Sequence, residues 1–535
     1  AWMAGLTALS GLALLLFVGT GVYDGAVVIE HREWIPEIGL ALSFRLDGLG
    51  LLFAQLILGI GLLVLFYARY YLSSAEGGPR LYVLLLLFMG AMLGLVLAEN
   101  LLLMLVFWEL TSLVSFLLIG FRRQEADARQ GARLALLITG GGGFALLAAI
   151  LLMGQVVGSY QISDLLESGQ AIENHALYPL ILVLFLLGVA TKSAQFPFHF
   201  WLPHAMAAPT PVSAYLHSAT MVKAGVFLLG RFFPVLGGTE LWFYLVSGMG
   251  LTTLLLGAYL ALLQHDLKGL LAYSTISHLG LITLLFGLST PLGEIAAIFH
   301  IINHAVFKAS LFMAAGIIDH ESGTRDMRKL NGLFRCMPYT AVLAMVAAAA
   351  MAGVPLLNGF LSKEMFFGET LALQWLSEAD WRWLLPWAAT LAGIFAVAYS
   401  LRFIHDVFFN GEPRDLPKLP HEPPRWMLVP VEILVVLCVA VGVLPTLTVQ
   451  PLLEVAARAV LQMPLPEFSL SIWHGFTTPF MMSLVAMGGG VALYAGRRWL
   501  FATMDRLPVR LQGKGLTERF VEWLFALGRR LDGAV

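Results

Sequence analysis

The stretch LLLMLVFWELTSLVSFLLIGF occupies residues 101–121 and decides the class of fold. It is long enough to cross a bilayer as a helix, which takes about 20 apolar residues. Its one ionisable side chain is Glu109, and a charge at the bilayer centre costs about 2.5–3.5 kcal/mol on insertion scales. Glu109 is therefore a candidate functional residue. The alternative is a packing carboxyl group that bonds to nearby hydroxyl groups.

Similar segments recur along nearly the whole chain. Of the 535 residues, 59% are hydrophobic and 12% are charged, whereas soluble domains carry about 25% charged residues. The sequence therefore predicts an all-α polytopic membrane protein with about 14 transmembrane helices. The expected spans are residues 2–22, 48–71, 81–98, 100–121, 133–156, 179–200, 211–232, 240–263, 269–288, 294–317, 337–371 (broken), 385–409, 427–449 and 475–496.

Positively charged residues alternate between successive loops. One set of loops carries most of the Lys and Arg, and the positive-inside rule places this set in the cytoplasm. The other set includes the long segments 23–47, 157–178 and 450–474, which we expect to be loops. The basic set comprises Arg69, Arg80, Arg122, Arg123, Arg129, Arg133, Lys268, Arg325, Arg328, Lys329, Arg335, Arg414, Lys418, Arg425, Arg497 and Arg498.

The two ends of the chain carry separate signals. Residues 4–22 lack the basic region and cleavage site of a signal peptide, and we expect one further helix before residue 1. Residues 516–531 place apolar side chains on one face and charged side chains on the other. This pattern predicts a C-terminal amphipathic helix that lies along the membrane surface or against a partner.

Several functions lack support in the sequence. A net charge of −2 and the absence of a basic patch give no indication of nucleic-acid binding. Cys336 and Cys438 have no metal-ligand or redox spacing. We find no nucleophile triad, phosphate-binding loop or cofactor motif, so no cofactor or metal is predicted and the chain is not expected to be an enzyme.

Two lysines lie in or beside apolar helices in the middle of the chain. Lys192 stands five residues before Pro197, whose ring removes a backbone hydrogen bond, and irregular helix at membrane depth is tolerated beside a wet cavity. The alternative for Lys192 is a snorkelling lysine near a helix end. Lys223 follows His217 by six residues, which separates them by ~9 Å along a helix. Water could join the two, although His217 could also be a packing residue.

The strongest local signal is FHIINHAVFKASLF at residues 299–312. His300, His304 and Lys308 recur at every fourth position, which places them on one helix face in steps of ~6 Å. Histidine can both give and accept a proton near neutral pH, so this face predicts a proton wire. A metal site at His300 and His304 is the rival interpretation, but no carboxylate or cysteine lies near in sequence.

A broken helix follows in AMAGVPLLNGFLSKEMFF at residues 350–367. Gly353, Pro355 and Gly359 interrupt it, and Lys363 lies beyond the break. A discontinuous helix with a charge beside the gap is a recurring arrangement in ion transporters. His278 lies within the expected span 269–288 and is a further candidate. The other polar groups near helix ends are expected to be interfacial or capping groups: Asp47, His265, Asp266, Lys268 and Asp406.

Several of these segments resemble one protein family. FWELTSLVSFLLIGF (107–121), the run from Ala190 to Arg231, HDLKGLLAYSTISHLG (265–280), the run from His300 to Leu333 and AGVPLLNGFLSKEMFF (352–367) are similar to the antiporter-like subunits. Respiratory complex I and the multisubunit Mrp cation/proton antiporters share this family. Residues 317–333 and 359–367 are most similar to the large A subunits of Mrp complexes, which usually extend well beyond 535 residues.

The resemblance implies two inverted five-helix repeats with broken helices. Glu109 and Lys192 would form the switch of the first half-channel, and Lys223, beside His217, would carry protons across the middle. His300, His304 and Lys308 would continue the path to Lys363 at the exit. The implied domains are 1–80 (N-terminal helices), 81–232 (first half-channel), 233–268 (connecting helix), 269–410 (second half-channel), 411–500 (C-terminal helices) and 501–535 (lateral helix).

The expected function is proton translocation within a multisubunit Na⁺/H⁺ antiporter of a bacterial cytoplasmic membrane. Its expected partners are other membrane subunits of a hetero-oligomer, protons, Na⁺ and the lipid bilayer. Three alternatives remain: a proton-pumping subunit of a complex I-type or hydrogenase complex, a membrane partner in bicarbonate accumulation, and a structural subunit with inert lysines.

Overall fold

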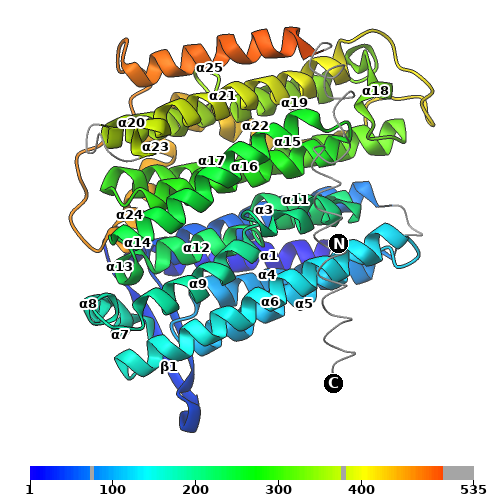
Figure 1. The fold of residues 1–535 in the computed structure, drawn as a ribbon. Helices are drawn as coiled ribbons and strands as arrows, with labels where there is room; N and C mark the ends of the chain where they lie inside the picture. Colours follow the sequence, from blue (N-terminus) through cyan, green and yellow to red (C-terminus); the bar gives the residue numbers. More distant parts are fainter. Residues whose placement is uncertain (73–76, 375–380, 498–535) are drawn as a thin grey trace, which may run out of the picture.

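Long helices packed side by side form the molecule (Figure 1). The computed structural model describes residues 1–72, 77–374 and 381–497. Within them, 11 helices are long and apolar enough to cross a membrane, and three shorter apolar helices cover residues 2–18, 178–192 and 338–352. Each corresponds to one of the expected spans, which confirms the polytopic helical fold. The predicted surface helix at 516–531 lies outside the described residues.

The bounds of the elements follow the expected spans closely. The longer helices are α1 (Trp2–Val18), α3 (Gly48–Tyr71), α4 (Gly78–Leu97), α5 (Leu101–Ile119), α6 (Ala126–Val157), α9 (Tyr178–Lys192), α11 (Thr210–Ser218), α12 (Lys223–Arg231), α15 (Gly248–Leu263), α16 (Leu267–Gly287), α17 (Pro291–Ser322), α19 (Pro338–Ala352), α20 (Asn358–Gln374), α21 (Leu385–Leu401), α22 (Arg425–Val443), α24 (Gln450–Leu461) and α25 (Thr478–Ala495). The short elements are α2 (Thr20–Tyr23), β1 (Val28–Ile35), η1 (Pro36–Ile38), β2 (Leu40–Leu46), α7 (Ile162–Glu167), α8 (Gly169–Glu173), η2 (Phe198–Phe200), α10 (Trp201–His204), η3 (Ala205–Ala207), α13 (Phe233–Leu236), α14 (Glu240–Trp242), η4 (Phe243–Ser247), α18 (Met327–Leu330), η5 (Leu333–Arg335), η6 (Trp381–Leu384), η7 (Arg402–Asp406) and α23 (Pro445–Thr448).

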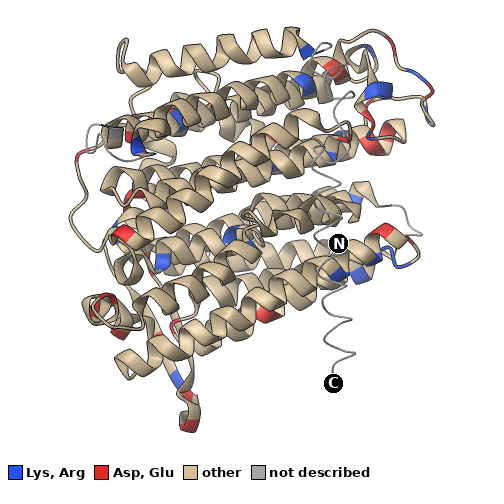
Figure 2. Cartoon of the chain, viewed as in Figure 1, with Lys and Arg blue, Asp and Glu red and all other residues tan. Residues whose placement is uncertain are grey.

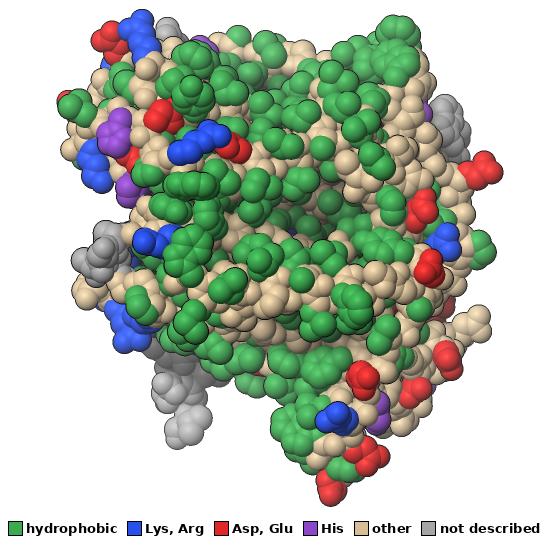
Figure 3. All heavy atoms as spheres, turned by 180° about the vertical axis from the view of Figure 1, so that it is seen from behind, with side chains coloured by type: hydrophobic (Ala, Val, Ile, Leu, Met, Phe, Trp, Pro, Cys, Tyr) green, Lys and Arg blue, Asp and Glu red, His purple; other side chains and the backbone are tan. Residues whose placement is uncertain are grey.

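The surface and the ends of the bundle differ in charge. On the face shown in Figure 3, hydrophobic side chains cover the middle and most charged side chains lie toward the two margins. Lys and Arg gather at the right-hand ends of the helices in Figure 2, where α18 and the α5–α6 loop lie. We call this the basic end. The opposite end, which carries β1, α7 and α8, is called the hairpin end.

Helix α17 lies at the centre of the bundle. It packs against α11, α16, α19, α20 and α22, and the membrane-length segment within it is entirely buried, whereas only 22% of the corresponding segment of the peripheral α25 is buried. Lipid therefore has no access to the polar face of α17. The His and Lys side chains on that face can contact only other helices or enclosed water.

Three helices are interrupted at membrane depth. Helix α9 ends at Lys192, and α20 begins after a gap at 353–357. These two interruptions were expected from Pro197 and Pro355. The third, at 219–222 between α11 and α12, was not, because it contains neither Gly nor Pro. There the Thr220 hydroxyl donates to the Tyr215 carbonyl oxygen at 2.7 Å, which satisfies a backbone group that the break leaves free.

All three long segments expected to be loops contain regular structure, and in 157–178 this consists of the short helices α7 and α8. Residues 23–47 form an antiparallel hairpin in which Val28 pairs with Leu46. Strand β1 is exposed along its whole length, whereas most residues of β2 are buried. Residues 450–474 include the amphipathic helix α24, which approaches α3 so closely that a Cβ at Gly48 would lie 1.9 Å from the Val455 carbonyl oxygen. The hairpin buries only strand β2, and α24 buries only one face, so neither segment has the continuous apolar run of a span.

A buried ion cluster ties the hairpin to the bundle. Asp47 caps α3 by accepting a hydrogen bond from Gly50 N at 2.9 Å, as expected for a capping group. It also accepts bonds from Arg45 Nε at 2.9 Å and from Arg231 of α12. Burial alone would raise the pKa of Asp47, but the Arg231 guanidinium outweighs it with the help of Gly50 and Arg45, and the pKa is lowered below its ordinary value.

Replacing Asp47 with Asn should destabilise the protein by about 3–5 kcal/mol, because it leaves the buried Arg231 charge with its main counter-ion removed. Since the pKa of Asp47 is lowered in the folded state, its contribution should be complete above about pH 5 and decline at lower pH. Thermal unfolding of the purified protein measures both effects. Asp266→Asn is the control, because Asp266 caps α16 in the same way but is partly exposed. Equal losses in the two variants would contradict this account.

Candidate functional site

Lys192 is the last residue of α9, and its ammonium group lies against α5 in the protein interior. The Nζ atom donates hydrogen bonds to the Trp108 carbonyl oxygen at 3.0 Å and to the Ser112 hydroxyl oxygen at 2.6 Å. It also lies 4.9 Å from the centre of the Trp108 ring. Both acceptors are neutral, so this pocket can hold either an ammonium ion or a neutral amine. Lys192 is fully buried, which rules out the snorkelling alternative.

Glu109 lies on α5 next to Trp108 and acts electrostatically on Lys192. No ion pair between the two is found among the described residues. The Glu109 Oε1 atom is buried and has no hydrogen-bond partner there. Glu109 and Lys192 are therefore near one another, as the switch hypothesis requires, but they are not in contact.

A run of glycines in α6 makes room for this site. A Cβ atom at Gly143 would lie 1.6 Å from Glu109 Oε1, and one at Gly142 would lie 1.7 Å from Thr191 Oγ1. Gly140 and Gly141 have open space instead. Small residues allow membrane helices to approach closely, and here they also leave the volume that the carboxylate occupies.

Lys223 follows the break at 219–222 and reaches the central helix. Its Nζ atom donates to the Ile301 carbonyl oxygen of α17 at 3.0 Å. His217 is fully buried between aromatic rings, 6.2 Å from Trp201 and 6.4 Å from Phe312, measured between ring centres. Neither ring nitrogen of His217 has a hydrogen-bond partner in the described residues.

Three histidines meet where α16 and α17 pack together. His278 Nδ1 lies 2.9 Å from His300 Nε2, and His300 Nδ1 lies 2.9 Å from the Ser362 hydroxyl oxygen. On the other side, the Tyr399 hydroxyl lies 3.3 Å from His278 Nε2. His304 lies beside them, with its ring centre 5.3 Å from that of His278 and the two rings tilted by 46°.

These contacts form a hydrogen-bonded chain across four helices. When Tyr399 donates to His278 Nε2, the Nδ1–H of His278 donates to His300, and the Nδ1–H of His300 donates to Ser362. The same contacts can carry the donors in the opposite order. A proton that enters at one end can therefore leave at the other by a change of tautomer, without movement of heavy atoms.

Lys308 and Lys363 lie near this chain and act electrostatically on His278. Lys308 Nζ bonds to the Ser274 hydroxyl and lies 3.2 Å from the Met351 sulfur. Lys363 Nζ donates to the carbonyl oxygen of Ala352, the last residue of α19, at 2.9 Å. A cation is favoured at this position because the carbonyl groups at the end of a helix lack partners.

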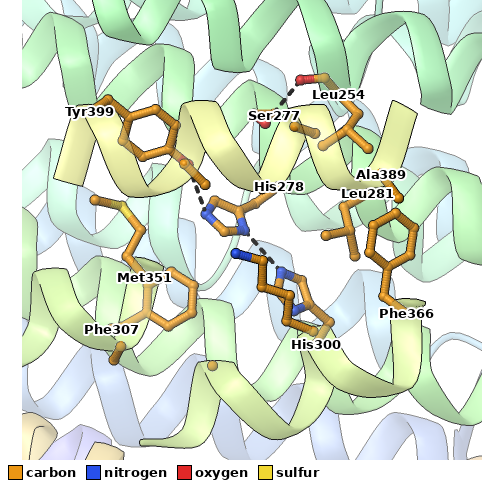
Figure 4. A pocket seen from close by; sticks show the side chains of 16 residues that line it. Leu254, Ser277, His278, Leu281, His300, Phe307, Met351, Phe366, Ala389 and Tyr399 are labelled. Atoms are coloured by element: carbon orange, nitrogen blue, oxygen red, sulfur yellow. Dashed lines mark hydrogen bonds between the residues drawn. The ribbon is translucent and has the colours of Figure 1, made fainter. Parts of the chain in front are cut away.

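A pocket with a cavity volume of about 30 Å³ adjoins the histidines. His278 and His300 project into it from α16 and α17, and Tyr399 faces them from α21 (Figure 4). Lys363 also lines it. This volume holds about two waters, since one water needs roughly 10–15 Å³ of it. The pocket therefore provides room for water between Lys363 and the histidine chain.

Sequence reasoning missed several members of the site. His278 was only a secondary candidate, and the hydroxyl groups of Ser112, Ser274, Ser362 and Tyr399 were not assigned to the path. Each belongs to a different helix from the charged group that it contacts, so spacing along the chain gives no signal. Among the described residues, no group of three or more His, Cys, Asp or Glu side chains is placed to hold a metal ion.

Helices of this bundle are interrupted beside buried lysines, and hydrogen-bonded histidines connect helices in its interior. These features define a class of multispanning membrane protein with an internal polar path. The chain belongs to the NADH:quinone oxidoreductase/Mrp antiporter transmembrane family, whose characteristic sequence pattern matches residues 98–393. Residues 34–82 match the N-terminal region of chain 5 of NADH-ubiquinone oxidoreductase (complex I). The resemblance found in the sequence is confirmed.

Individual proteins of known name are also similar over most of the chain. The A/B subunit of a probable K⁺/H⁺ antiporter of Rhizobium meliloti is 58% identical over 99% of this chain and 54% of its own length. The A subunit of a Na⁺/H⁺ antiporter of Alkalihalophilus pseudofirmus is 44% identical over 87% of this chain and 61% of its own length. The chain thus spans little more than half the length of these relatives.

A solved structure shares the fold. A chain of the Mrp complex from Dietzia sp. DQ12-45-1b matches with a TM-score of 0.87 and 37% identity. The match covers 98% of this chain and 57% of that chain. The arrangement of helices described above is therefore shared with part of that chain of the Mrp complex.

Proposed function

We propose that this chain is the proton-conducting part of a multisubunit cation/proton antiporter in a bacterial cytoplasmic membrane. The observation that carries the proposal is the series of buried basic side chains, each bonded to a neutral acceptor: Lys192, Lys223, His278, His300, Lys308 and Lys363. The role is that of a transporter subunit rather than a catalyst. Its partners would be the other membrane subunits of an Mrp-type complex.

The first step of the mechanism involves Glu109 and Lys192. When the carboxylate moves against the ammonium group, the ion pair holds the proton on Lys192. When it moves away, as in the present arrangement, Lys192 retains only neutral partners, and an unpaired charge in dry surroundings is unfavourable. The proton then leaves toward Lys223, so the position of Glu109 controls whether Lys192 keeps it or passes it on.

The later steps use the central helix. Lys223 contacts the carbonyl group of Ile301, the residue that follows His300 on α17. From there the proton can enter the histidine chain, with His304 and Lys308 alongside, and reach Lys363 through the pocket. His217 supports the region around Lys223. These roles remain proposals, and so does the division of the chain into two inverted repeats.

Inside-out vesicles from an antiporter-deficient host that expresses the complete gene cluster test this function. Respiration acidifies the vesicles, and a pH-sensitive dye follows the response to Na⁺, K⁺ or Li⁺. Rapid collapse of the gradient on addition of a cation supports antiport. We propose Na⁺ as the cation, and the assay compares it directly with K⁺, which appears in the name of one relative.

One alternative function has support from the family description. Because the family includes NADH:quinone oxidoreductase subunits, the same path could serve a redox-driven proton pump. No response to any cation, in vesicles that contain the assembled complex, would exclude antiport. Proton uptake that follows oxidation of a respiratory substrate instead would support the alternative.

A further inference from the structure

Two buried glutamates near the hairpin end have no role in the path described so far. Glu294 lies in the first turn of α17 and is 0% exposed, and Glu369 lies on α20 and is 7% exposed. Glu369 acts electrostatically on Glu294. Two carboxyl groups taken out of water need either a proton or a cation between them.

The surroundings of the two carboxyl groups differ. Glu369 accepts a hydrogen bond from the hydroxyl group of Thr290, the capping residue of α17. Both oxygens of Glu294, by contrast, lack a hydrogen-bond partner among the described residues. No ion pair to a Lys or Arg side chain is found for either group in the described part of the chain. Glu369 is therefore suited to carry the negative charge, and Glu294 to carry a proton.

The two glutamates lie beyond His300 and Lys363 along α17 and α20, toward the hairpin end. Glu294 precedes His300 by six residues on α17, and Glu369 follows Lys363 by six residues on α20. Six residues span ~9 Å of helix. Because α17 begins at the hairpin end and α20 runs toward it, both carboxyl groups lie on the same side of the basic groups. Lys363 and Glu369 are both buried, at 9% and 7% exposed, so a proton that leaves Lys363 in this direction meets a carboxyl group before it reaches water.

We propose that Glu294 and Glu369 form a proton-release site. Glu294 holds one proton at rest. Glu369 receives this proton from Glu294 and releases it at the hairpin end. This inference rests on the proposed function. The transfers balance: Glu294 gives its proton to the Glu369 carboxylate and takes a new one from an ammonium or imidazolium group, which becomes neutral, and water takes the proton from Glu369 as its carboxylate re-forms.

Infrared difference spectroscopy of the purified complex tests the resting state without any need for transport. Glu294→Gln should remove one C=O band of a protonated carboxylic acid, a band that shifts in D₂O. Glu369→Gln should keep that band, since Glu294 stays buried and protonated. Both variants should slow cation-driven proton movement by about 10²-fold, the size of effect expected when a proton-transfer group is lost. Thr370→Val is the control, because the Thr370 hydroxyl bonds only to its own helix, at the Phe367 carbonyl oxygen.

Three outcomes would overturn the proposal. The acid band could survive in Glu294→Gln, both variants could transport normally, or added Na⁺ or K⁺ could remove the band from the unmodified complex at constant pH. The last result would identify a cation site instead. An unmodified complex that shows the band but no cation-driven proton movement would disprove antiport, while leaving the protonated pair in place.

Discussion

Replacing Lys192 with Ala should abolish cation-driven proton movement while the complex still assembles. Lys192 contacts α5 from the end of α9, and its neutral partners cannot take over a proton. We expect a loss of about 10²–10⁴-fold, the range for removal of a proton-transfer group. The rate of gradient collapse in inside-out vesicles measures it, normalised to the amount of assembled complex in the membrane.

Glu109→Gln tests the role of Glu109 as a switch separately from the role of Lys192 as a proton carrier. The variant keeps the size of the side chain beside Gly143 but removes the charge that attracts Lys192, so transport should again fall strongly. Ser115→Ala is the matched control on α5, because the Ser115 hydroxyl donates only to the Ser112 carbonyl oxygen of its own helix. Normal transport in Glu109→Gln would disprove the switch and leave Lys192 as a carrier alone.

The second large effect is expected at His300, the centre of the histidine chain. His300→Gln can still form hydrogen bonds to His278 and Ser362, but an amide cannot accept a proton and pass it on. Transport should fall about 10²–10⁴-fold, with little change in the thermal unfolding temperature. Initial rates in the same vesicles, together with unfolding curves of the purified complex, measure the two quantities.

The transport rate of His300→Gln distinguishes a proton-conducting chain of histidines from a cluster of histidines that only packs. A packing role predicts lower stability in His300→Gln and retained transport per folded complex. Ser310→Ala on α17 is the control, since the buried Ser310 hydroxyl has no partner among the described residues. Retained transport in His300→Gln would also exclude a proton path through the Tyr399–His278 contact, because that contact reaches Ser362 only through His300.

Much of the fold follows from the sequence because the bilayer restricts the choices. A span must be apolar and about 20 residues long, so segments such as 101–121 and 211–232 are found with bounds close to those of the structure. Proline marks the interruptions near Lys192 and at 353–357. The interruption at 219–222 has no such marker. Side-chain hydroxyl groups stabilise it through hydrogen bonds that exist only in the folded chain, so the sequence carries no signal for it.

The site is only partly visible in the sequence for a different reason. A charged residue in an apolar helix is conspicuous wherever it lies, so Glu109, Lys192, Lys223, Lys308 and Lys363 were found. Their partners are common residues whose importance comes from contacts between helices. Glu294 was overlooked because it stands in the first turn of a helix, where an acidic residue is ordinary, and only packing against α20 shows that it is buried.

The absence of a side chain at Gly143 limits which substitutions this site can accept during evolution. Residues 109 and 143 form one steric unit, in which volume added at one position must be given up at the other. A shorter acid at position 109 would leave room for Ala at 143, whereas Glu at 109 requires Gly. Such paired constraints narrow the routes by which the family can vary here, since either substitution made first passes through a form with a clash or a void.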